Sequence, residues 1–82
     1  MFFEVEVMRQ DFEIDDSREI GKIIKSIRKK LGVTQRNLAL TSGTGLRFII
    51  ELEKGKPTCQ LEKALTVLRT LGLKLVIKGK SS

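Results

Sequence analysis

The turn SGTG at residues 42–45 separates two short segments that have the apolar spacing of helices. Thr34 is suited to cap the first segment, because its hydroxyl can accept a hydrogen bond from the amide of Asn37. Gly43 supplies the backbone freedom that a sharp turn requires. The sequence therefore predicts two short helices that meet at a tight, glycine-containing turn.

Three apolar residues indicate how these two helices pack. The small side chain of Ala39 allows a close approach, and Ile49 with Leu52 anchors the second helix, predicted from about residue 46 to 54. Two short helices in this arrangement form a helix-turn-helix. With one face anchored, the opposite face of the second helix is free to enter a DNA major groove.

Helical patterns continue on both sides of this pair. Asp16 and Glu19 resemble a capping box that opens a helix near Ser17, and Gly32 ends that helix. A fourth helix begins at Thr58 or Gln60. Its predicted inner face consists of Leu61, Ala64, Leu65, Leu68 and Leu71.

The two ends of the chain alternate apolar and polar residues, which predicts a strand at each end. Residues 2–8 carry acids and residues 73–78 carry lysines, so antiparallel pairing between them is favourable. An isolated two-stranded ribbon is marginal in water. We therefore expect two subunits to join their ribbons into one sheet. The predicted dimer strand contains Leu73, Leu75, Val76 and Ile77.

The predicted fold class is mainly α, with short terminal β-strands that form the dimer sheet. We divide the 82 residues into an acidic N-terminal strand and extension at 1–16, a helix-turn-helix DNA-binding domain at 17–72, and a C-terminal strand and tail at 73–82. No apolar run approaches the roughly 18 residues that a membrane helix needs. The single cysteine, Cys59, cannot form an internal disulfide, which agrees with a reducing cytoplasm, so we expect a cytoplasmic, nucleoid-associated protein.

Composition argues against catalysis and metal binding. The chain has no His, Trp or Tyr, and its one cysteine, Cys59, has neither a histidine to activate it nor a cysteine with which to pair. Zinc and iron sites require more ligands of these types. We expect no enzyme activity, no metal site and no cofactor.

Charge is unevenly distributed along the chain. Residues 1–19 hold seven acids and two bases, whereas residues 20–82 hold fourteen bases and three acids. A body with a net charge of +11 attracts polyanions, of which nucleic acid is the commonest in the cytoplasm. The acidic segment has three open roles: pairing with the basic C-terminal strand, docking on a partner protein, or covering the basic face.

Residues 17–72 resemble the Xre/lambda-repressor-like DNA-binding domain. The resemblance lies in the sequences IRKKLGVTQRNLA, SGTG and FIIELEKGKPT. The continuation LEKALTVLRTLGLKLVIKG is similar to HipB-like antitoxins. This likeness implies a homodimer that binds a palindromic operator in double-stranded DNA, represses its own operon and binds a HipA-type kinase toxin. Residues 1–16 lie outside the family pattern.

The third helix is predicted to read the DNA. Its first turns and outer face contain Gly45, Leu46, Arg47, Phe48, Ile50 and Glu51. Arg47 either pairs bidentately with guanine or contacts a phosphate. Leu46 or Phe48 is placed to contact a thymine methyl group, with Phe48 equally suited to the core. Many relatives have polar residues where Gly45, Leu46 and Ile50 stand, and Ile50 has the alternative of facing a partner subunit.

The resemblance also assigns roles outside the third helix. Gln35 corresponds to a residue that contacts the DNA backbone, with Thr34 and Arg36 beside it. Lys54 and Lys56 either contact phosphates or belong to a solvated basic loop. The pair Arg28 and Glu53 is implied to bridge the first and third helices.

The sequence is compatible with three hypotheses for the function. The first is a transcriptional repressor that is also the antitoxin of a HipBA-like operon. The second is a protein-interaction module that mainly sequesters a kinase toxin, and the third is a stand-alone phage-type repressor. An RNA-binding module is disfavoured, because the chain lacks an exposed aromatic platform for base stacking.

Overall fold

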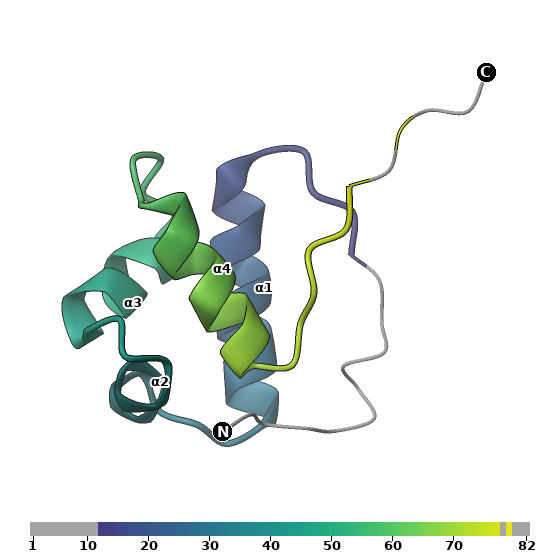
Figure 1. Ribbon diagram of the computed structural model, residues 1–82. Helices are drawn as coiled ribbons and strands as arrows, with labels where there is room; N and C mark the ends of the chain where they lie inside the picture. Colours follow the sequence, from purple (N-terminus) through teal and green to yellow (C-terminus); the bar gives the residue numbers. More distant parts are fainter. Residues whose placement is uncertain (1–11, 78, 80–82) are drawn as a thin grey trace.

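The computed structural model describes residues 12–77 and residue 79, and within them the chain forms four α-helices (Figure 1). These helices are α1 (Ser17–Lys30), α2 (Gln35–Ser42), α3 (Leu46–Glu53) and α4 (Leu61–Thr70). Helix α3 packs against both α1 and α2, and α2 also packs against α4. The mainly helical fold predicted from the sequence is therefore confirmed.

Helix α1 begins where the sequence predicts. The side chain of Asp16 caps the helix by accepting a hydrogen bond from the backbone N–H of Arg18 at 2.9 Å. The carboxylate of Glu19 turns back and accepts a hydrogen bond from the backbone N–H of Asp15 at 3.4 Å. A further hydrogen bond from the Arg18 side chain lowers the pKa of the Asp16 carboxyl. The Asp16 carboxylate therefore stays charged to a lower pH than an ordinary aspartate.

One apolar core joins the four helices. It is formed by Ile24, Ile27, Val33, Leu38, Ala39, Ile49, Leu52, Ala64, Val67, Leu68 and Leu71. Leu61, predicted to lie on the inner face of α4, is instead 65% exposed. Leu61 is the first residue of the helix, and the buried positions begin one turn later at Ala64. Val67, which the predicted inner face omitted, is fully buried.

The predicted C-terminal strand is absent from the described residues. After α4, residues 73–77 form neither helix nor strand (Figure 1). The N–H of Leu73 donates to the carbonyl oxygen of Leu68 at the end of α4, at 2.8 Å. Leu73 is half-buried against the core, whereas Leu75, Val76 and Ile77 are exposed. A strand exists only when a neighbouring strand satisfies its backbone groups, and the described part of this single chain offers none. The N-terminal strand predicted at residues 2–8 lies outside the described residues.

No helix in the part of the chain that the structure describes has the length and apolar character of a membrane span. In the same residues, the side chains of His, Cys, Asp and Glu form no cluster of three that suits a metal ion. Cys59 is a half-buried free thiol beside the core.

Candidate nucleic-acid interface

Helix α2 is capped at both ends by the residues that the sequence indicates. The Thr34 hydroxyl accepts a hydrogen bond from the backbone N–H of Asn37 at 3.0 Å, as predicted. At the other end, Gly43 adopts a left-handed conformation with φ of 72°. Its N–H donates to the carbonyl oxygen of Ala39 at 2.9 Å. Side chains other than glycine rarely adopt this φ, so Gly43 is the residue that allows the turn.

The turn between α2 and α3 is short and internally bonded. The hydroxyl oxygens of Ser42 and Thr44 lie 2.8 Å apart and share a hydrogen bond. Gly45 is exposed and precedes α3 at the N-cap position, without a side-chain cap. The chain therefore changes direction between Ser42 and Leu46 and presents α3 beside α2.

The inner face of α3 is fixed to the core. Ile49 is fully buried and Leu52 is 2% exposed, which confirms the predicted anchors. Helix α1 approaches the same helix at Gly21. A Cβ atom on Gly21 would overlap the backbone carbonyl oxygen of Leu52 and lie 3.2 Å from the Cα of Glu53. The position of α3 is therefore set by backbone contact as well as by side-chain packing.

A buried ion pair ties α1 to the end of α3. The Nε of Arg28 donates to one oxygen of the Glu53 carboxylate at 2.6 Å, and Nη2 donates to the other at 3.0 Å. The remaining Nη1 donates to the carbonyl oxygen of Val33 at 2.9 Å. Two parallel bonds between a guanidinium and a carboxylate fix both distance and orientation.

Gln35 extends this buried network to α2. Its side-chain Nε2 donates to Glu53 at 3.1 Å, and the residue is half-buried. The sequence predicted a DNA contact for Gln35 and did not predict this bond. In the structure, the two bonds from Arg28 leave the buried carboxylate with unused acceptor capacity, which Gln35 fills. Gln35 thus connects the start of α2 to the end of α3.

The outer face of α3 carries an exposed arginine. The Arg47 side chain is 92% exposed, and its Nε lies 3.7 Å from a carboxylate oxygen of Glu51 one turn later. The other oxygen of Glu51 accepts a hydrogen bond from Nζ of Lys56 at 3.3 Å. Lys54 is also exposed. These charged side chains line the face opposite the anchors.

The apolar side chains of α3 are less exposed than Arg47. Leu46 and Phe48 are half-buried and pack against the core, and Ile50 is half-buried as well. The Nζ of Lys63 on α4 lies 5.7 Å from the centre of the Phe48 ring, within the range of a cation–π contact. Phe48 therefore packs against the core and contacts Lys63 of α4. The spacing of residues within α3 does not predict this contact.

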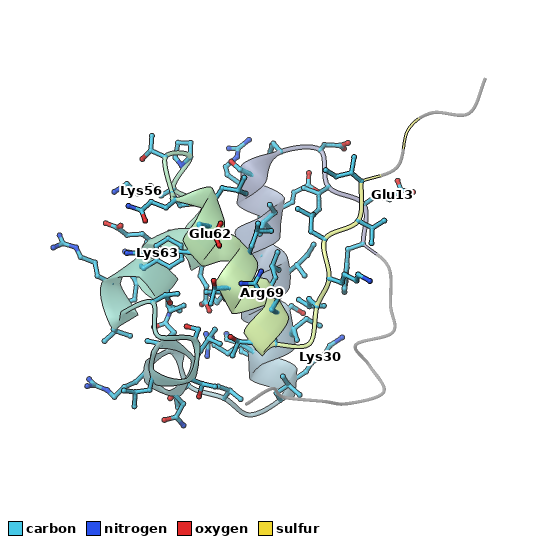
Figure 2. The ribbon with its side chains drawn as sticks, in the orientation of Figure 1. Glu13, Lys30, Lys56, Glu62, Lys63 and Arg69 are labelled. Atoms are coloured by element: carbon cyan, nitrogen blue, oxygen red, sulfur yellow. The ribbon has the colours of Figure 1, made fainter. Side chains whose placement is uncertain are left out.

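Exposed residues at the start of α2 extend the surface formed by the outer face of α3. Thr34 and Arg36 are exposed there. The segment between Thr34 and Lys56 carries four basic residues and two acidic ones, and one of the acids, Glu53, is buried in the ion pair. Figure 2 shows Lys56 and Lys63 on the side of the molecule where α3 lies. The surface around α3 is therefore mainly cationic.

Comparisons with known proteins agree with this geometry. The family described as Helix-turn-helix (HTH_3) matches residues 24–77. An uncharacterised HTH-type transcriptional regulator, y4mF, of Sinorhizobium fredii (strain NBRC 101917 / NGR234) is 48% identical over 59 residues, which cover 72% of this chain and 78% of that protein. An uncharacterised HTH-type transcriptional regulator of Haemophilus influenzae is 35% identical over 78 residues, which cover 92% of this chain and 79% of that protein.

Solved structures of HipB have the same fold. A complex of a HipB variant with an O2 20mer aligns with a TM-score of 0.79, 21% identity, and coverage of 88% of this chain and 100% of that chain. A HipB-O4 20mer complex aligns with a TM-score of 0.78 and 21% identity, and covers 87% of this chain and 100% of that chain. The chain therefore belongs to the helix-turn-helix family of the Xre/lambda-repressor type, and its helical fold is that of HipB.

Proposed function

We propose that this protein is a homodimeric, sequence-specific DNA-binding repressor, and that it serves as the antitoxin of a HipBA-like operon. The observation that carries the proposal is the exposure of Arg47 on a helix whose opposite face is buried through Ile49 and Leu52. The second helix of a helix-turn-helix is the element that enters the major groove. Related HTH-type regulators and the fold of HipB support this proposal.

The surface residues divide into two groups by their chemistry. Arg47 has the donor geometry to pair with N7 and O6 of guanine. The residues proposed to surround Arg47 at the DNA are Leu46, Phe48, Ile50 and Glu51 of α3 and Gly45, which precedes the helix. The proposed phosphate contacts come from Thr34, Gln35 and Arg36 at the start of α2, where backbone N–H groups also favour anions, and from Lys54 and Lys56. These contacts position the protein on the duplex without reading its sequence.

Replacement of Arg47 by alanine tests the reading role. We expect the affinity for a duplex selected by the wild-type protein from a randomised library to fall by about 1–3 kcal/mol, because a bidentate guanine contact is lost. Affinity for an unrelated duplex of the same length falls much less. Fluorescence anisotropy titrations of both duplexes measure the difference.

Arg36→Ala is the matched control for this experiment. It removes the same kind of exposed side chain from the start of α2. We expect it to weaken both duplexes equally and to reduce the slope of log K against log salt by about one. If Arg47→Ala behaves in this way too, Arg47 contacts a phosphate and does not read a base.

A homodimer is proposed from the exposed apolar end of the chain. Leu75, Val76 and Ile77 follow α4, and Ile77 is 90% exposed. A second copy would supply the neighbouring strand that these residues lack. Two-fold symmetry would place the two reading helices about 34 Å apart, one turn of DNA.

Sedimentation velocity at tens of micromolar tests the dimer. The wild-type chain is expected to sediment as a dimer and Ile77→Asp as a monomer, because the charge would enter the apolar sheet. Leu61→Asp is the control, since it changes an exposed leucine in the first turn of α4, where an acid suits the helix dipole. A monomeric wild-type protein would contradict the dimer.

The proposed protein partner is a HipA-type kinase toxin, and the proposed location is the cytoplasm, on the nucleoid. The resemblance of residues 61–79 to HipB-like antitoxins suggests this partner. A kinase-like reading frame next to this gene, whose product co-purifies with this chain, is the expected finding. Operator binding without such a partner would instead indicate a stand-alone repressor.

A further inference from the structure

Glu51 is a partly exposed acid on a surface of opposite charge. The structure describes all residues from Thr34 to Lys56, and these include four bases and two acids. The carboxylate of Glu53 is buried beside Arg28, whereas the side chain of Glu51 is 35% exposed. DNA phosphates repel a carboxylate, so Glu51 opposes the binding that the surrounding cations favour.

The carboxylate of Glu51 holds two of these cations. One oxygen lies 3.7 Å from Nε of Arg47, and the other accepts a hydrogen bond from Nζ of Lys56 at 3.3 Å. Arg47 and Glu51 are one helical turn apart and so share a face of α3. The contact uses Nε of Arg47, whereas bidentate recognition of guanine can use the two terminal nitrogens.

We propose that Glu51 determines specificity by weakening binding to DNA of arbitrary sequence more than binding to the operator. This inference rests on the proposed DNA-binding function. On arbitrary DNA, the phosphates attract Arg47 and Lys56 away from Glu51. The carboxylate then faces the phosphates without a counter-charge, and the complex is destabilised.

An operator removes this penalty. The terminal nitrogens of Arg47 bind guanine while Nε stays beside Glu51, so the ion pair survives in the complex. The carboxylate of Glu51 also accepts a hydrogen bond from the exocyclic amino group of a cytosine in reach. Specificity is a difference between two affinities, and a repulsive group that acts mainly on the wrong complex increases it.

Glu51→Gln tests the inference because it keeps the shape of the side chain and removes its charge. The probes are a duplex that the wild-type protein selects from a randomised library and an unrelated duplex of equal length. We expect affinity for the unrelated duplex to rise about three- to tenfold as two cations become free for phosphates. Affinity for the selected duplex is expected to change less than about twofold, so the ratio of the two affinities falls.

Salt dependence gives a second readout. For the unrelated duplex, we expect the slope of log K against log salt to become steeper by about one to two in the variant. A purely structural role of Glu51 would not produce a steeper slope. Circular dichroism melting of Glu51→Gln verifies that the variant is folded at the temperature of the titrations.

Glu13→Gln is the matched control, because it removes one negative charge from the side of the molecule opposite α3 (Figures 1 and 2). If this control changes the affinity ratio as much as Glu51→Gln, the effect comes from net charge and the inference is wrong. An unchanged ratio in Glu51→Gln also refutes it, while leaving the DNA-binding function intact. A wild-type protein that selects no sequence from the library refutes the proposed function and this inference together.

Discussion

Replacement of Arg28 by alanine is expected to lower the free energy of unfolding by about 3–5 kcal/mol, because it leaves the buried carboxylate of Glu53 without its counter-ion. The Arg28 and Glu53 side chains are 10% and 3% exposed, so water does not replace the lost partner. Three hydrogen bonds from the guanidinium disappear together. Gln35 retains its bond to Glu53, but a neutral amide does not neutralise the charge.

Urea denaturation followed by circular dichroism measures this loss. Lys29→Ala is the matched control, since it removes a cation from the next, exposed position of α1 and is expected to change stability by less than about 0.5 kcal/mol. In the Arg28→Met/Glu53→Met double variant, we expect much of the stability to return, because apolar pairs of similar volume often replace buried ion pairs without loss. Equal stability of Arg28→Ala and Lys29→Ala would show that the pair does not hold α1 against α3.

Helix ends and the turn could be predicted because their causes are local. The Asp16 cap, the Thr34 cap and the left-handed Gly43 each depend on residues within four positions along the chain. The apolar spacing of Ile49 and Leu52 likewise identifies the buried face of α3. Those signals are sufficient to indicate a helix-turn-helix and the face that it leaves exposed.

Contacts between helices could not be predicted in the same way. The hydrogen bond from Gln35 to Glu53 joins residues 18 positions apart, and it depends on how α2 and α3 are placed in space. The partial burial of Phe48 under Lys63 requires the position of α4. The pairing of Arg28 with Glu53 followed from resemblance to a family, since composition and spacing alone do not select partners.

In the C-terminal segment, the alternation of apolar and polar residues was not sufficient to predict a strand. Alternation from Leu73 to Ile77 predicts which residues would share a face of a strand, but it does not provide the neighbouring strand. The described residues of a single chain contain none. The apolar side chains of Leu75, Val76 and Ile77 therefore remain exposed, and the dimer stays a prediction to be tested in solution.

Gly21→Ala is expected to destabilise the fold by about 2–4 kcal/mol, although the same change at an exposed position in a helix stabilises a protein by about 0.5–1 kcal/mol. Gly21 is buried where α1 meets α3, and the added methyl group would overlap the backbone carbonyl of Leu52. That carbonyl accepts a hydrogen bond from the N–H of Gly55 at 3.1 Å, so it cannot turn aside without disrupting the end of α3. The two helices must separate, and steric overlap outweighs helix propensity.

The separation of α1 and α3 also bears on DNA binding, because Glu53 follows Leu52 directly and forms the ion pair with Arg28. We expect Gly21→Ala to lower the melting temperature by at least about 8 °C and to weaken binding to the selected duplex even where the variant is folded. Ser26→Ala, at an exposed position of α1, is the control and should be neutral or slightly stabilising. If Gly21→Ala is as stable as Ser26→Ala, the close approach of α1 to α3 is wrong, and the position of Arg47 relative to the globule must be revised with it.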